Sequence, residues 1–154
     1  MSIKIVDDKR AWDRLVRELE ATGDKEVVVG IQQGSVNDGL QVAQYATWNE
    51  FGTSTIPSRP FMRNYFDSSV DGLTRFTVNG IAKVLTGRAT LNQFFNAAGS
   101  RMVSGVKKSI NSGGWTPNAP YTIAKKGSSK PLIDTGVMLN SVTFAIHKYG
   151  TTKE

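Results

Sequence analysis

The sequence predicts a single α+β domain, in which a small, mainly antiparallel sheet packs against two long helices. Residues 26–31 are β-branched and almost continuously apolar, which is typical of a buried strand. Residues 61–86 and 90–110 carry apolar side chains three and four positions apart, the spacing of one helical face. Residues 141–149 alternate apolar and polar side chains, which indicates a second strand with one buried face. We therefore expect one α+β domain over residues 1–154.

The N-terminal region predicts a short strand followed by a helix. Residues 3–6 are the candidate strand and a possible third member of the sheet. Asp7 or Asp8 is placed to cap a helix over residues 9–21, because a side-chain oxygen at this position accepts a bond from an unpaired backbone N–H. One face of the helix carries Trp12, Leu15, Val16 and Leu19.

A second helix is expected over residues 39–51. The polar, glycine-containing segment 32–37 is expected to be a loop, and Asp38 is placed to cap the first turn. Gly52 follows the last apolar position, where glycine favours the end of a helix. The helix is therefore expected to stop at Phe51.

An extended segment then leads into the first long helix. Pro57 and Pro60 deny the backbone two donor groups and helical continuity. Pro60 also suits the first position of a helix, so Phe61 is expected to begin it as a core anchor. Gly72 and Gly80 each weaken this helix by about 1 kcal/mol relative to alanine, which predicts a kink or a close packing contact near one of them. Thr90 is placed to cap the second long helix.

Residues 111–130 are expected to form an extended loop or arm. Their composition shifts to Gly, Ser, Pro, Thr, Asn and Lys, and no period is sustained. Trp115 and Tyr121 lie in this segment, and such aromatic side chains are enriched in protein interfaces. Two alternatives remain open. The arm docks on a neighbouring molecule, or Trp115 folds back on its own domain.

The C-terminal region predicts a short helix and the second strand. The helix is expected around residues 137–139, with Asp134 or Thr135 as its cap. In the strand over residues 141–149, one face is expected to carry Val142, Phe144 and Ile146.

The composition excludes several classes of site. The chain has no cysteine, which removes disulfides, thiol nucleophiles and zinc sites with thiolate ligands. His147 is the single histidine and is expected at the surface, so neither a metal nor a cofactor is expected. No apolar run approaches the roughly 18 residues of a membrane span, and no secretion signal is visible. We expect no membrane association and assembly in a reducing cytoplasm.

The charge balance is weak support for nucleic-acid binding. Nineteen Lys and Arg against thirteen Asp and Glu give a net charge of +6, but the cations are spread along the chain. Adjacent lysines occur only at residues 107–108 and 125–126, and short basic pairs are usually solvated surface. Passive contact with DNA is therefore favoured over sequence recognition.

Two motifs carry a family resemblance. The first is Ala43-x-x-Ala46-x-x-Asn49-Glu50-Phe51-Gly52-Thr53, followed by Ile56-Pro57-x-Arg59-Pro60-Phe61-Met62-Arg63. The second is Lys130-Pro131-Leu132-Ile133-Asp134-Thr135-Gly136-x-Met138-Leu139-x-Ser141-Val142. Together, in this order, they resemble the tail-completion and head–tail joining (neck) proteins of long-tailed bacteriophages, which are related to phage virion morphogenesis proteins.

The resemblance implies a structural protein of the virion tail or neck that carries out no reaction. It implies a homo-oligomeric ring, expected to be a hexamer, that completes the tail and allows head–tail joining. Its expected partners are copies of itself, tail tube or terminator proteins, and head–tail connector proteins, with DNA passing through the channel without sequence recognition. A tail terminator or a minor tail protein of the same region is the alternative.

A closed ring requires two different surfaces of one subunit to meet. The candidate interface residues are Glu50, Ile56, Arg59, Phe61, Arg63, Trp115, Tyr121, Lys125 and Lys126, and the candidate structural residues are Gly52, Pro57, Pro60, Asp134 and Gly136. The guanidinium groups of Arg59 and Arg63 are expected to pair with Glu50 or with a carboxylate on the adjacent subunit, and both alternatives stay open.

Two rival functions remain. Leu132-Ile133-Asp134-Thr135-Gly136 also resembles the catalytic turn of dimeric, retroviral-type aspartic proteases, in which two aspartates share a proton. Those proteases are nearly all-β, which two long helices contradict, so a helix-capping role for Asp134 is preferred. The other rival is a basic nucleic-acid-binding module.

Overall fold

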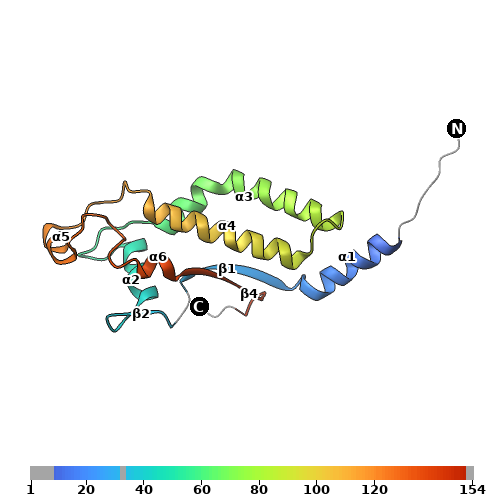
Figure 1. The fold of residues 1–154 in the computed structure, drawn as a ribbon, viewed down its shortest axis with the longest axis horizontal. Coiled ribbons are helices and arrows are strands. Elements are labelled where there is room, and N and C mark those ends of the chain that lie inside the picture. The colour runs from blue at the N-terminus through green and yellow to red at the C-terminus, as the bar shows by residue number, and fades with distance from the viewer. Residues whose placement is uncertain (1–8, 32–33, 152–154) are drawn as a thin grey trace. The chain divides into compact units, whose positions relative to one another are not determined.

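The computed structural model describes residues 9–31 and 34–151 and confirms the α+β class (Figure 1). The predicted strand over residues 3–6 and its neighbours Asp7 and Asp8 lie outside the described residues. Over the described part of the chain, the elements are α1 (Lys9–Thr22), β1 (Lys25–Ile31), β2 (Val36–Asn37), β3 (Leu40–Gln41), α2 (Val42–Phe51), α3 (Phe61–Leu85), α4 (Leu91–Asn111), α5 (Pro120–Lys126), α6 (Val137–Ser141) and β4 (Val142–Lys148).

The strands form two separate two-stranded pairings. β1 pairs with β4, and the two lie side by side in Figure 1 although they come from opposite ends of the sequence. This confirms the predicted pairing of the two principal strands. β2 and β3 form an antiparallel hairpin in which Val36 faces Gln41 and Asn37 faces Leu40.

The hairpin corrects the predicted start of the second helix. Asp38 and Gly39 occupy its turn with φ of 50° and 77°, so Asp38 does not cap a helix. An Asp-Gly pair suits a tight hairpin turn because both central residues require positive φ. The helix α2 begins only at Val42, whose N–H donates to the Ser35 carbonyl at 2.8 Å.

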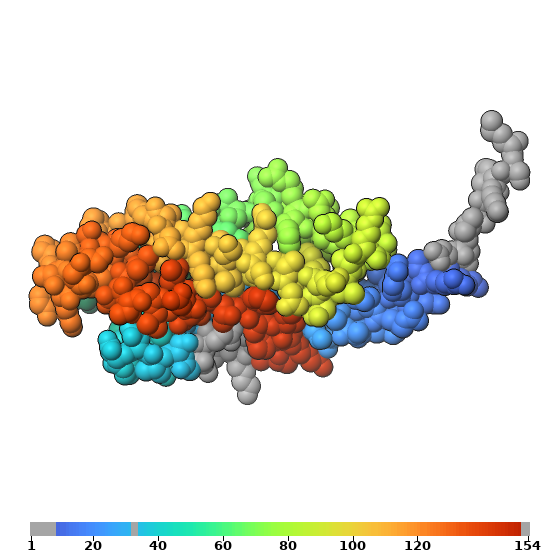
Figure 2. Space-filling model, viewed as in Figure 1, coloured from blue at the N-terminus to red at the C-terminus, as the bar shows by residue number. Residues whose placement is uncertain are grey.

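The expected arm is also corrected, because part of it is helical. Pro120 occupies the first turn of α5, and Gly127 ends the helix with φ of 67°. Trp115 packs against the hydrophobic core, and its indole N–H donates to the Ser109 carbonyl at 3.3 Å. The segment, orange in Figure 2, lies against neighbouring parts of its own unit. The alternative in which Trp115 folds back is confirmed, while Tyr121 remains 78% exposed.

The described residues divide between two compact units. Of the described residues, the first unit draws on 9–27, 71–98 and 146–151, and the second consists of 28–31, 34–70 and 99–145. The core of the second unit is formed by Val42, Ala46, Phe61, Val106, Ile110, Met138 and Val142. Phe61 is 1% exposed, which confirms its predicted role as a core anchor.

In the first unit, the predicted features around the turn between the long helices are confirmed. Thr90 Oγ1 accepts a bond from the N–H of Gln93 at 3.1 Å, and the Thr90 N–H donates to Gln93 Oε1 at 2.9 Å. This reciprocal pair caps α4. Gly80 makes the expected close contact, because a Cβ there would lie 2.4 Å from the ring of Phe94. The Phe94 ring stacks on Phe76 at 6.0 Å.

None of the helices within the described ranges has the length and apolar character needed to cross a membrane.

Candidate functional site

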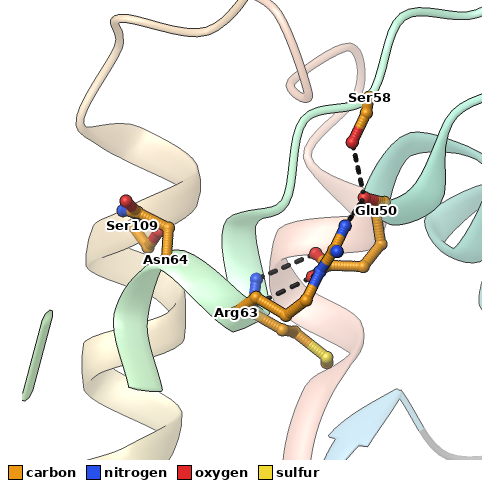
Figure 3. Close-up of polar contacts among 6 residues, drawn as sticks. Glu50, Ser58, Arg63, Asn64 and Ser109 are labelled. Atoms are coloured by element: carbon orange, nitrogen blue, oxygen red, sulfur yellow. Dashed lines mark hydrogen bonds and ion pairs between the residues drawn. The ribbon is translucent and has the colours of Figure 1, made fainter. Parts of the chain in front are cut away.

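The carboxylate of Glu50 joins the end of α2 to the start of α3 (Figure 3). It accepts the N–H of Met62 at 2.9 Å and the N–H of Arg63 at 3.1 Å. The first N–H groups of a helix have no partner within the helix, and its N-terminus favours negative charge. Glu50 is only 5% exposed, so these bonds satisfy a buried carboxylate. Glu50 thus caps α3 from a different helix.

Arg63 completes this contact within the chain. Its Nε donates to Glu50 Oε1 at 3.1 Å, and its Nη2 donates to the Glu50 carbonyl at 2.7 Å. Figure 3 shows the Ser58 hydroxyl converging on the same carbonyl, at 2.9 Å. The guanidinium also lies 4.9 Å from the centre of the Phe51 ring. Of the two open alternatives for Arg63, pairing with Glu50 within the chain is confirmed.

Arg59 has a different set of partners. Its side chain donates to the carbonyls of Thr116 at 2.8 Å and Pro117 at 3.2 Å. It also donates to the amide oxygens of Asn49 at 3.0 Å and Asn118 at 3.3 Å. The expected pairing of Arg59 with Glu50 is therefore absent from the contacts of the described residues. Arg59 ties the proline-containing segment to residues 116–118 instead.

These acceptors are all uncharged, although Arg59 is 5% exposed. Burial therefore lowers the pKa of Arg59 from its ordinary value. Buried cations are usually paired with an anion, because removing a charge from water is costly. Hydrogen bonds to neutral acceptors alone are thus an unusual feature of Arg59 at the junction between α2 and α3, which comprises residues 49–63.

The bend between α2 and α3 depends on Gly52. Its φ is 81°, and a Cβ there would lie 3.0 Å from the Ser58 nitrogen and 3.1 Å from the Ile56 carbonyl oxygen. The Gly52 N–H donates to the Trp48 carbonyl, which confirms the predicted end of α2. After the bend, the chain lies against the end of α2, where the Arg59 N–H donates to the Asn49 carbonyl at 2.6 Å. The first motif is therefore a compact, hydrogen-bonded corner.

The second motif forms the turn that enters α6, and here the predicted cap is wrong. The residue immediately before α6 is Gly136, with φ of 81° and no side-chain cap. Neither Asp134 nor Thr135 occupies the position from which a side chain caps a helix. Asp134 is exposed. Burial lowers the pKa of Lys126, and the negative charge of Asp134 partly offsets that lowering. The helical backbone predicted after Gly136 is confirmed.

Residues of both motifs line one pocket of about 390 Å³ in the second unit, here called the motif pocket. Its lining includes Asn49, Ile56, Pro57 and Arg59 from the first motif, Asn118, Thr122 and Lys126 from the segment between the motifs, and Leu132, Asp134, Thr135 and Gly136 from the second. Sequence reasoning named several of these residues individually but missed the pocket. The two motifs were the available signal for the pocket, and a motif does not say which residues lie close together after folding.

The candidate interface residues fall into groups of different exposure. Glu50, Arg59 and Phe61 are buried, so their contacts stabilise the subunit itself. Ile56, Trp115 and Lys126 are half-buried, whereas Arg63, Tyr121 and Lys125 are exposed. Among the described residues, no cluster of three or more His, Asp or Glu side chains has the arrangement of a metal site.

Comparison with known proteins found no relative of this chain, so the description of the junction depends on its geometry. No family model matches the sequence, and no curated protein or solved structure matches it.

Proposed function

We propose that this chain is a structural virion protein of a long-tailed bacteriophage, whose copies form a ring in the tail or neck. The ring completes the tail and allows the head to join it. The observation that carries this proposal is the meeting of the two motifs. They lie far apart in sequence, yet both line the motif pocket and both contribute to one hydrophobic core. Segments that resemble one protein family are expected to converge if they form a shared functional face.

The hydrogen bonds and the ion pair that cross-link the junction support an architectural role. The cap from Glu50, the ion pair with Arg63 and the Arg59 contacts cross-link α2, the start of α3 and residues 116–118. A ring closes only if each subunit presents its two contact surfaces at a fixed angle. A pre-organised corner also reduces the entropy lost on association.

Exposed aromatic side chains beside the junction provide candidate contact surfaces. Tyr121 on α5 is 78% exposed, and Phe51 at the end of α2 is 65% exposed. Both belong to the second unit. Aromatic side chains dominate the energetics of many interfaces because they bury a large area with little loss of conformational freedom. Lys125, which neighbours Tyr121, adds a charge that can steer association and is screened by salt.

The resemblance sets the proposed partners. They are copies of this chain, tail tube or terminator proteins, and connector proteins of the head. The net charge of +6 supports passive contact with DNA in the axial channel, and such contact weakens as salt concentration rises. A role as tail terminator or minor tail protein places the same ring at a neighbouring position in the virion.

The test compares two exposed tyrosines. Native mass spectrometry and negative-stain images of the purified chain should show closed rings of one order, and tails that lack the protein should bind heads after it is added. Tyr121→Ser should shift the rings toward monomers. Tyr149→Ser changes a side chain that is 76% exposed in the first unit, and should leave the rings intact.

The proposal fails if the chain stays monomeric at every concentration and is absent from purified particles. Loss of rings in both tyrosine variants would place the contact surface elsewhere than beside the junction.

A further inference from the structure

The motif pocket contains more positive than negative charge. Arg59 and Lys126 both line it, and Asp134 is the one carboxylate among the described residues that do so. Burial lowers the pKa of Lys126, the charge of Asp134 raises it and the charge of Arg59 lowers it, so both charges act on the Lys126 amino group. The pocket therefore carries a cationic excess that its own residues do not neutralise.

The hydrogen bonds of the two cations leave donors uncommitted. The Lys126 amino group donates to the carbonyls of Lys130 and Ile133, and an ammonium group has three donors. Four of the five Arg59 donors have the neutral acceptors described above. Within residues 9–31 and 34–151, one donor of each cation thus has no acceptor among the contacts of the structure. A carboxylate has two oxygens that can accept such donors.

The remaining lining is suited to an acceptor group as well. Tyr45, Thr122 and Thr135 add hydroxyl groups, and Asn118 adds an amide. Burial raises the pKa of Tyr45, so its hydroxyl keeps its proton at neutral pH. Ile56, Pro57 and Leu132 add apolar surface beside these polar groups. An aliphatic stem that ends in a carboxylate matches this combination of linings.

We propose that the motif pocket binds the carboxylate of an acidic side chain presented by another protein subunit. The Lys126 ammonium and the remaining Arg59 donor hold the two oxygens, and the apolar lining contacts the aliphatic stem. This inference deepens the proposed function, because it names the chemistry by which the junction recognises its partner. The acidic side chain belongs either to a second copy of this chain or to a different virion protein.

The binding test uses the full chain and four defined probes. Acetyl-Gly-Glu-Gly-amide and glutarate carry the carboxylate, acetyl-Gly-Gln-Gly-amide is its neutral match, and inorganic phosphate represents other anions. Amide chemical shifts are followed during each titration. The glutamate peptide should shift the pocket residues and bind about tenfold or more tightly than the glutamine peptide. Equal affinity of the two peptides, or equally tight binding of phosphate, would overturn the proposal.

Three variants locate the binding to this pocket. Lys126→Met should weaken binding of the glutamate peptide about tenfold or more, because it removes one of the two cations. Lys108→Met is the matched control on an exposed lysine of α4 outside the pocket lining, and should change the affinity less than about twofold. Asp134→Asn should strengthen binding, because it removes the competing carboxylate. Unchanged binding in Lys126→Met, or weaker binding in Asp134→Asn, would refute the assignment.

A second measurement distinguishes the two sources of the carboxylate. Excess glutamate peptide should dissociate the rings if a second copy fills the pocket, and should leave the rings intact but block attachment of the other virion protein if that protein fills it. The peptide titrations are read on single chains as well as on rings. Failure of carboxylate binding is therefore distinguishable from failure to form rings.

Discussion

At the scale of single residues, the most consequential side chain of the junction is Glu50. Replacement by glutamine keeps the size of the side chain but removes its negative charge, to which the Arg63 guanidinium and two helix N–H groups donate hydrogen bonds. Because the carboxylate is buried while Arg63 is half-exposed to water, the loss should be smaller than for a fully buried pair. We expect Glu50→Gln to lower the free energy of unfolding by about 2 to 3 kcal/mol, measured by urea denaturation.

Asp67→Asn is the matched control for this prediction. Asp67 is an exposed carboxylate on the same helix, α3, and its neutralisation should change stability by less than about 0.5 kcal/mol. Equal losses in the two variants would show that the cap at the start of α3 contributes no more than an ordinary surface charge.

Sequence reasoning succeeded at residues whose role is set by backbone chemistry. Gly52, Phe61 and Thr90 were predicted correctly, because helix ends, core anchors and caps have local signals. The contacts of Arg59 could not be predicted from the sequence. Its acceptors are two backbone carbonyls and two side-chain amide oxygens, and no residue pattern indicates such partners. The cap expected from Asp134 was wrong because Gly136 occupies the capping position.

At the scale of elements, length decides which predictions hold. The long helices α3 and α4 repeat their apolar period over several turns, so their bounds agree with the prediction within a residue or so. The hairpin β2–β3 and the helix α5 are too short to show a period. The Asp-Gly pair of the hairpin turn and Pro120 in the first turn of α5 were the local signals that point to them.

The packing of α3 against α4 within the second unit predicts the effect of filling a glycine position. A Cβ on Gly105 would lie 2.0 Å from the Tyr65 ring, so the helices or the ring must move. Alanine would otherwise favour a helix by about 1 kcal/mol over glycine. The overlap should outweigh this gain, and we expect Gly105→Ala to lower the free energy of unfolding by about 1 to 2 kcal/mol net.

Ser104→Ala is the control for the glycine substitution. Ser104 is the exposed neighbour of Gly105 on α4, so alanine there changes helix propensity without meeting a ring. It should raise the free energy of unfolding by a few tenths of a kcal/mol. A gain in both variants, seen as higher urea midpoints, would mean that α3 and α4 are farther apart at this position.

At the scale of the whole molecule, the fold class followed from a few long signals, whereas the candidate site did not. The class depends on which strands pair and on the two long helices, and both were predicted. The motif pocket depends on short segments from three places in the chain that meet only after folding. The division into two compact units likewise separates each long helix into parts, which no break in their sequence periods indicates.

The stability of the whole chain should also depend on pH in the alkaline range. Burial raises the pKa values of Tyr45 and Tyr65 above the ordinary value of 10.0. Above pH 10, these tyrosines lose protons in the unfolded chain before they do in the folded chain. The unfolded state then binds fewer protons, so the free energy of unfolding falls as pH rises through this window.

Below pH 10.5, the titration of Lys126 has the opposite effect on the free energy of unfolding. Burial lowers its pKa below 10.5, so between its folded and ordinary values the unfolded chain binds more protons than the folded chain. Its contribution to the free energy of unfolding therefore rises with pH until that ordinary value is reached.

Lys126→Met should flatten this rise, and Tyr45→Phe with Tyr65→Phe should reduce the fall above pH 10. The profile comes from urea denaturation at closely spaced pH values, and Tyr121→Phe is the control for an exposed ring. An unaltered fall in the double tyrosine variant would assign the alkaline loss to other groups.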